Sequence, residues 1–151
     1  MFKNILCPID LNPRSKMALK KAVNIAYQFN SKIILLNIHE EFYSKEEMVM
    51  SRVSVNTLNE EFKKIAIEAK DDMKSLIREL EADDIECEYL LREGKSSDVI
   101  LKISEEENID LIVMGTNGRN SLSDYVVGST TQKVIESSKC PVLVMPKGES
   151  N

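Results

Sequence analysis

Three glycines at fixed spacing, followed by a run of hydroxyl side chains, are the residues of this sequence best suited to chemistry. Two and then nine residues separate the glycines, and the set is Gly115, Gly118 and Gly128, with Ser129 and Thr130 directly after. Glycine lets the backbone approach a ligand closely. A helix start offers unpaired N–H groups and the positive end of its dipole, which favour an anion. The stretch therefore predicts a phosphate cradle between a strand and a helix.

A second candidate is the acidic residue that ends the first apolar run of the chain. Asp10 follows Asn4–Ile9, a run that reads NILCPI and has no polar alternation. Such a run is typical of a parallel strand that is covered on both faces. An aspartate at its carboxyl end is placed either to face a ligand or to cap the helix that begins near Pro13, and both interpretations stay open.

The elements that must position these residues alternate along the chain. Apolar runs predict strands at 4–10, 32–39, 85–91, 111–114 and 142–145, and three-to-four-residue periodicity predicts helices at 13–29, 56–82, 96–108 and 129–138. The helix at 96–108 is expected to take Ser96 or Ser97 as its cap. Alternation of this kind gives an α/β fold, a single-domain three-layer sandwich with a five-stranded parallel sheet and helices on both faces.

Composition narrows the class of protein. The chain has 151 residues, of which 42% are hydrophobic and 30% charged, and this size suits one globular domain. Its net charge of -5 argues against sequence-independent binding of nucleic acid, which needs a basic surface. The sequence shows neither an apolar run of membrane-spanning length nor the apolar region of a signal peptide. Three cysteines without metal-like spacing are expected to be reduced thiols of a cytoplasmic protein.

The glycine spacing resembles a known family. The pattern Gly-x2-Gly-x9-Gly-Ser, set between NILCPID, NIDLIVMGTNGR and KCPVLVMP, is similar to the ATP-binding branch of the universal stress protein family over nearly the whole chain. The resemblance implies a Rossmann-like sheet, of the adenine nucleotide alpha hydrolase type, with strand order 3-2-1-4-5. It also implies a domain over residues 1–147 and a tail over 148–151. In such sheets, ligands bind at the carboxyl ends of the strands where the order reverses, here between the first and fourth strands.

The resemblance also implies a site for ATP with Mg²⁺ or Mn²⁺. Asp10 matches a residue that lies by the ribose or phosphates and helps to hold the divalent ion. Pro8 and Ile9 match residues that line the adenine site, and Ile38 matches a position whose backbone recognises the adenine edge.

Further implied contacts lie in the glycine stretch. They are Gly115 and Gly118 at the ribose and phosphates, Gly128, Ser129 and Thr130 at the phosphates, and Met114 and Asn117 beside the nucleotide. Arg119 either reaches a γ-phosphate or points to water. Many members of the family carry Gly-Ser where this chain has Leu11 and Asn12, and a further glycine at Ser121, so loop shape and affinity can differ here.

The leading hypothesis is a cytoplasmic universal stress protein that binds ATP and acts as a nucleotide-dependent regulator in stress response. The alternative is a slow ATPase, or another ATP-using enzyme on the same fold. A nucleotidylyltransferase needs paired histidines, and His39 is the single histidine of the chain. A phospho-receiver would have an acceptor aspartate where Gly115 stands.

Two further expectations concern assembly and a segment beside the cleft. The last strand, 142–145, lies at a sheet edge in the implied order, and the family pairs it with its symmetry mate, so a homodimer is expected. Segment 40–55 mixes apolar and charged residues without a clear period. It is expected to be mobile without nucleotide and to cover the adenine side when nucleotide is bound.

Overall fold

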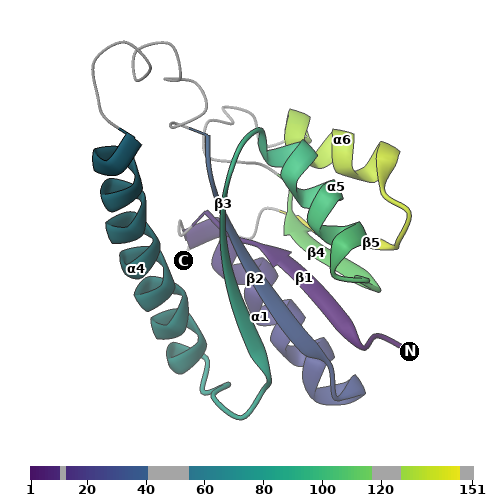
Figure 1. The fold of residues 1–151 in the computed structure, drawn as a ribbon. Coiled ribbons are helices and arrows are strands. Elements are labelled where there is room, and N and C mark those ends of the chain that lie inside the picture. Colours follow the sequence, from purple (N-terminus) through teal and green to yellow (C-terminus); the bar gives the residue numbers. More distant parts are fainter. Residues whose placement is uncertain (11–12, 41–54, 117–126, 147–151) are drawn as a thin grey trace.

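The computed structural model describes residues 1–10, 13–40, 55–116 and 127–146 (Figure 1). Five strands and four helices alternate along these residues, as the sequence predicts. They are β1 (Asn4–Pro8), α1 (Pro13–Phe29), β2 (Lys32–His39), α4 (Val55–Glu79), β3 (Cys87–Glu93), α5 (Ser96–Glu106), β4 (Leu111–Gly115), α6 (Ser129–Ser137) and β5 (Val142–Met145). The expectation for segment 40–55 falls almost wholly outside the described residues, apart from Glu40 and Val55.

The strands form one parallel sheet of order β3-β2-β1-β4-β5, which confirms the predicted order. β1 lies in the middle and pairs with β2 from Asn4–Lys32 to Pro8–Leu36. On its other side β1 pairs with β4 only at Ile5–Leu111 and Leu6–Ile112. β3 and β5 are the two edges.

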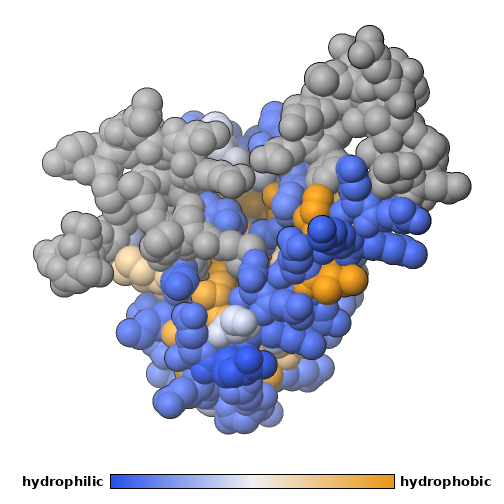
Figure 2. Space-filling model, turned by 90° about the vertical axis from the view of Figure 1, so that its left-hand side faces the viewer, coloured by the Kyte–Doolittle hydropathy of each residue, from blue (hydrophilic) through white to orange (hydrophobic). Residues whose placement is uncertain are grey.

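Helices cover both faces of the sheet, which gives the predicted three layers (Figure 1). Alternate strand residues point to opposite faces. One set packs with α1 and α4 around Leu19, Val23, Met73 and Ile77, and the other packs with α5 and α6 around Ile100, Ile103 and Val134. Seen from the α4 side, the coloured surface is mainly hydrophilic with separate hydrophobic patches (Figure 2). Within the described residues, no helix is long and apolar enough to span a bilayer.

The cysteines are free thiols, and two of them have raised pKa values. Cys7 is fully buried in the central strand, and burial raises its pKa to about 12. Burial also raises the pKa of Cys87 to about 11. Both values lie well above neutral pH, so these thiols stay protonated and behave as packing groups.

Several element boundaries differ from the sequence prediction by a few residues. β1 ends at Pro8 rather than at Asp10, and α4 ends at Glu79, three residues before Ala82. β3 runs from Cys87 to Glu93 rather than over 85–91, because Asn37, Ile38 and His39 of β2 continue the pairing as far as Glu93. The helix cap expected at Ser96 or Ser97 is wrong: Lys95 is the N-cap of α5, and no side chain caps it.

A carboxylate ties the start of β1 to the turn that leads into β4. Asp110 Oδ2 accepts hydrogen bonds from the backbone N–H groups of Lys3 (2.9 Å) and Asn4 (2.8 Å). The backbone N–H of Asp110 donates to the carbonyl of Asn4 at 2.9 Å. This contact bridges more than a hundred residues of chain and fixes the level at which β1 and β4 begin to pair.

We expect Asp110→Ala to lower the free energy of unfolding by about 2 kcal/mol, because each hydrogen bond to a charged group contributes roughly 1.5–3 kcal/mol and this one is partly screened by solvent. Asp110→Asn keeps an acceptor without the charge and should lose about half as much. Urea unfolding followed by circular dichroism measures both values. An Asp110→Ala protein as stable as wild type would show that this clamp contributes nothing.

Candidate functional site

The two central strands separate at their carboxyl ends. The pairing of β1 with β4 stops at Leu6 and Ile112, whereas β4 goes on pairing with β5 as far as Gly115 and Met145. The chain leaves β1 for α1 on one face of the sheet and leaves β4 for α6 on the other. The result is a fork between β1 and β4, at the point where the strand order reverses.

Pro8 gives a physical reason for the fork. Residues of a central strand direct their backbone groups alternately to the two neighbouring strands. The N–H of Ile9 donates to the Leu36 carbonyl of β2 at 2.8 Å, so the preceding residue, Pro8, faces β4. Proline has no N–H to donate, and the ladder between β1 and β4 cannot continue through it.

The register brings three predicted site positions to one level. β1 pairs with β2 in a register that begins at Asn4–Lys32. Continued beyond the last pair, this register places Asp10 opposite Ile38. The pair Leu6–Ile112 likewise places Asp10 opposite Thr116, next to Gly115. Asp10 therefore stands between the end of β2 and the end of β4, and its carboxyl group is exposed.

The end of β2 presents backbone groups to the fork. Leu36 directs its carbonyl to β1, so Ile38, two residues further on, directs its backbone N–H and C=O the same way. β1 has already ended at Pro8. The side chain of Ile38 packs against the α5–α6 core, and the residue therefore offers one donor and one acceptor of its main chain rather than a side chain.

The start of α6 is tied back to the end of β4. Gly128 donates its N–H to the Thr116 carbonyl at 2.8 Å, and Thr131 Oγ1 donates to the Gly115 carbonyl at 2.9 Å. Thr116 donates in turn to Met145 of β5 at 3.1 Å. The first bond within the helix runs from Gln132 N–H to the Gly128 carbonyl. The backbone N–H groups of residues 129–131 therefore lie outside the helical ladder, beside the fork.

Charge distinguishes the helix starts at this edge. α5 has Asp98 in its first turn, and the Ser96 N–H donates to Glu40 Oε1 at 2.8 Å, so carboxylates already occupy that helix start. α1 and α6, which flank the fork, have no acidic residue in the first turn. Because a helix start favours negative charge, the start of α6 is the better place for an anion.

The structure places the predicted site residues unequally. Asp10, Gly115, Gly128, Ser129 and Thr130 lie along the fork, and Ser129 is exposed. Ile9 and Met114 are 2% and 5% exposed, and their side chains lie in the two cores, so they can offer a ligand only backbone. Pro8 is half-buried at the end of β1. Asn117, Gly118 and Arg119 lie outside the described residues, as do Leu11, Asn12 and Ser121.

Sequence reasoning missed three residues that organise this edge. Thr131 is 2% exposed and holds α6 to β4, and Glu40 satisfies the start of α5. Asn37 is 4% exposed and donates from Nδ2 to the Ile9 carbonyl at 2.9 Å. A signal for Asn37 was present, because it is the one polar residue in the run IILLNI of β2.

Gly128 and Ser129 define the start of α6, which lies where the sequence predicts it. The N-cap of α6 is Gly128, with φ −61° and ψ 156°, and no side chain caps the helix. Ser129 is therefore the first helical residue rather than the cap, so its hydroxyl is not committed to the helix end. The extended φ of Gly128 is accessible to any residue, and a side chain there meets no backbone strain.

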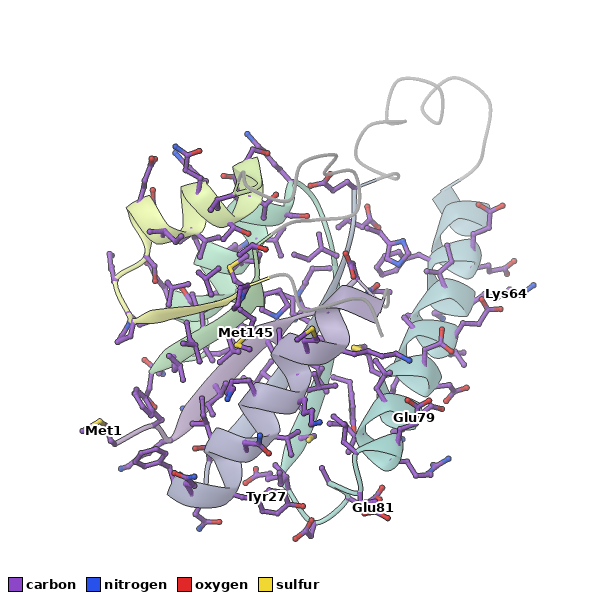
Figure 3. All side chains as sticks on the ribbon, turned by 180° about the vertical axis from the view of Figure 1, so that it is seen from behind. Met1, Tyr27, Lys64, Glu79, Glu81 and Met145 are labelled. Atoms are coloured by element: carbon purple, nitrogen blue, oxygen red, sulfur yellow. The ribbon has the colours of Figure 1, made fainter. Side chains whose placement is uncertain are left out.

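A hollow of about 230 Å³ lies at the opposite, amino edge of the sheet, lined by Ala26, Tyr27, Asn30, Ser31, Asp84, Ile85 and Glu86. Tyr27 and Glu81 mark this end in Figure 3. The Tyr27 hydroxyl donates to Asp84 Oδ1 at 2.6 Å and lies 3.2 Å from the Glu81 carbonyl, a second acceptor. These contacts join α1 to the turn after α4. The hollow is remote from the fork and takes no part in it.

Comparison with known proteins places the fold in a family. A model of the universal stress protein family matches residues 1–146. Universal stress protein MJ0577 of Methanocaldococcus jannaschii is 31% identical over 159 residues, which cover 99% of this chain and 98% of that protein. A universal stress protein of Staphylococcus aureus is 29% identical over 145 residues, with 95% and 84% covered.

Solved structures agree with this match. The structure of MJ0577 superposes with a TM-score of 0.81 and covers 99% of each chain. UspA from Lactobacillus plantarum gives a TM-score of 0.74 at 26% identity, covering 95% of this chain and 97% of that one. A universal stress protein in complex with cAMP shares the fold, with a TM-score of 0.65 at 21% identity, covering 97% and 98%. By sequence and by fold, this chain belongs to the universal stress protein family.

Proposed function

We propose that this protein binds ATP with a divalent cation in the fork between β1 and β4, and acts in the cytoplasm as a nucleotide-dependent regulator. The observation that carries the proposal is the pairing of two features across the fork. On one side stands the start of α6, which has no acidic residue in its first turn, and on the other the backbone edge of Ile38, which lies beyond the last residue of β1. The first suits phosphates and the second suits a flat base with its own donor and acceptor.

The adenine edge fits the backbone of Ile38. Adenine carries an amine donor at N6 beside a ring-nitrogen acceptor, and one peptide edge offers an acceptor C=O and a donor N–H. Such a pair of bonds tells adenine from guanine, whose corresponding edge has a carbonyl and an N–H. The side chain of Ile38 packs against the apolar α5–α6 core, which includes Leu36 and Leu90, so the surroundings of that edge have low polarity.

The phosphates fit the start of α6, and the metal fits Asp10. Within the described residues, no group of three or more His, Cys, Asp or Glu side chains is arranged to hold a metal by itself. Mg²⁺ is commonly bound by one or two carboxylates together with substrate phosphates. A single exposed aspartate opposite a phosphate site suits a metal that arrives with the nucleotide, whereas a resident metal would need more ligands.

Family membership and the fold support the proposal from outside the site. One protein of this fold has been solved with cAMP, so an adenine nucleotide is a ligand of that protein. That protein is 21% identical to this chain, and at this level of identity the likeness shows a shared fold alone. cAMP is therefore a useful competitor in the binding test, because it shares the base and lacks the triphosphate.

Substitutions at the fork should separate its parts. Gly128→Val should abolish ATP binding without unfolding the protein, because φ at this site suits any residue and the new side chain would occupy the space of the phosphates. Ser129→Ala should weaken binding by about 1.5–3 kcal/mol, the loss of one hydrogen bond to a charged group. Asp10→Asn should reduce the dependence on Mg²⁺ and leave adenosine binding unchanged. Isothermal titration calorimetry with ATP, cAMP and adenosine measures these effects.

Ser137→Ala is the matched control, since Ser137 ends α6 far from its start and is exposed. It should bind ATP as wild type does. A folded Gly128→Val protein with wild-type affinity would place the phosphates elsewhere. Release of ADP during the titrations would favour the alternative, a slow ATPase.

We also propose a homodimer through the edge strand β5. β5 pairs with β4 on one side, and the half-buried side chains of Val142 and Val144 lie at the edge of the sheet. An apolar edge strand invites pairing with another chain. A two-fold axis would pair β5 with its own copy in an antiparallel arrangement, which suits an isologous interface.

Val144→Asp should convert the dimer into a monomer, because the interface would have to bury a charge without a partner. Ile67→Asp is the control: Ile67 is 64% exposed on α4, which covers the β3 side of the sheet. Light scattering coupled to size exclusion measures the mass, and circular dichroism confirms folding. A Val144→Asp protein that remains a dimer would rule out this interface.

A further inference from the structure

Asn37 combines two features that are unusual together. It is a polar side chain buried to 4% exposure on the face of β2 that packs against α1 and α4. Its neighbours on that face are apolar, among them Leu35, Ile9 and Leu91. Only half of its amide is satisfied, because Nδ2 donates to Ile9 and Oδ1 is buried without a partner among the described residues.

A buried acceptor without a partner is destabilising, and leucine would fill nearly the same volume without it. The contact that Asn37 does make fixes the orientation of its amide, since a carbonyl such as that of Ile9 accepts only from the NH₂ end. What distinguishes Asn37 from leucine is therefore the hydrogen bond to Ile9. Violations of packing rules of this kind are expected at functional sites.

The Ile9 carbonyl has an obvious alternative donor. In the parallel register of β1 with β2, the Ile9 N–H donates to Leu36, and the next step of the ladder would join the Ile38 N–H to the Ile9 carbonyl. The structure gives this carbonyl to Asn37 Nδ2 at 2.9 Å instead. The side chain of Asn37 has taken the place of the backbone donor next to it.

We infer that Asn37 is a positioning residue, whose bond to the Ile9 carbonyl competes with the next bond of the ladder and so keeps the backbone N–H of Ile38 available to the base of a bound nucleotide. This inference rests on the proposed function. Without Asn37 the ladder can extend by one bond, which would consume the donor that reads the base. The same bond keeps the last peptide before Asp10 attached to β2 while β1 separates from β4.

Asn37→Leu tests the inference in two ways. In the ligand-free protein, the Ile38 amide should exchange with solvent readily in wild type and become protected in Asn37→Leu, as measured by NMR hydrogen exchange. In calorimetry, Asn37→Leu should bind ATP about tenfold more weakly, the loss of one hydrogen bond. It should also lose its preference for ATP over inosine triphosphate, while its affinity for inorganic tripolyphosphate stays unchanged.

Thr131→Val is the control variant that should affect the phosphate side and not the base side. It removes the hydrogen bond between the start of α6 and Gly115 and leaves β2 unchanged. It should weaken tripolyphosphate and ATP together and keep the preference for adenine. Thermal unfolding confirms that both proteins are folded.

Unchanged exchange of the Ile38 amide, or an unchanged preference for ATP in folded Asn37→Leu, would overturn the inference. A wild-type protein that binds tripolyphosphate but does not prefer ATP would also overturn it. A wild-type protein that binds neither ligand would refute the proposed function itself, and the base-reading role with it.

Discussion

The missing N–H of Pro8 is the constraint on which the site depends. β1 is the middle strand and must bond to both halves of the sheet, yet its last paired residue can donate nothing to β4. A parallel sheet that is buried on both faces tolerates an open ladder only at an end, where ligand or water can replace the lost partner. The fork therefore lies at the carboxyl edge, and the reversal of strand order puts the starts of α1 and α6 on its two sides.

Short contacts between strand ends and helix starts hold the edge in shape. Thr131 and Gly128 bond to Gly115 and Thr116, and Glu40 bonds to Ser96. Each contact joins the end of one strand to the start of a helix. The strand ends therefore fix the positions of these helix starts. The two helices on the α5–α6 face differ in one respect: Asp98 and Glu40 place carboxylates at the start of α5, whereas the first turn of α6 has no acidic residue.

The sequence predicted the fold because its signals are local. Apolar runs, helical periodicity and the alternation of the two are each readable in short windows, and the strand order followed from resemblance to the family. The glycine spacing and Asp10 were also readable, and the register brings Asp10 and Gly115 close to one level. The burial of Ile9 and Met114 was also readable from the sequence. Alternate residues along a strand point to opposite faces, and this alternation along β1 and β4 directs both side chains into the hydrophobic cores.

The residues that were missed depend on contacts between distant segments. Nothing within a few residues of Asn37 shows that its amide will meet the Ile9 carbonyl, because that bond requires the register of β1 with β2. Lys95 is the N-cap of α5 in place of a serine, and the carboxylate of Glu40, far back in the chain, accepts a hydrogen bond from the Ser96 N–H at this helix start. Capping preferences describe isolated helix ends, and here a tertiary contact outweighed them.

Net charge constrains how such a protein can hold a triphosphate. The chain carries 20 lysines and arginines against 25 aspartates and glutamates, so its long-range field disfavours an anion. Under the proposed function, short-range groups would have to supply the attraction: the N–H groups and dipole of α6, which act over the first turn, and a cation held between Asp10 and the phosphates. A carboxylate so close to the phosphate site would repel bare ATP, and with a divalent ion between them the same carboxylate attracts it. If the proposed site is right, the placement of Asp10 would make the metal part of the recognition, whereas an arginine at this position would make the metal dispensable.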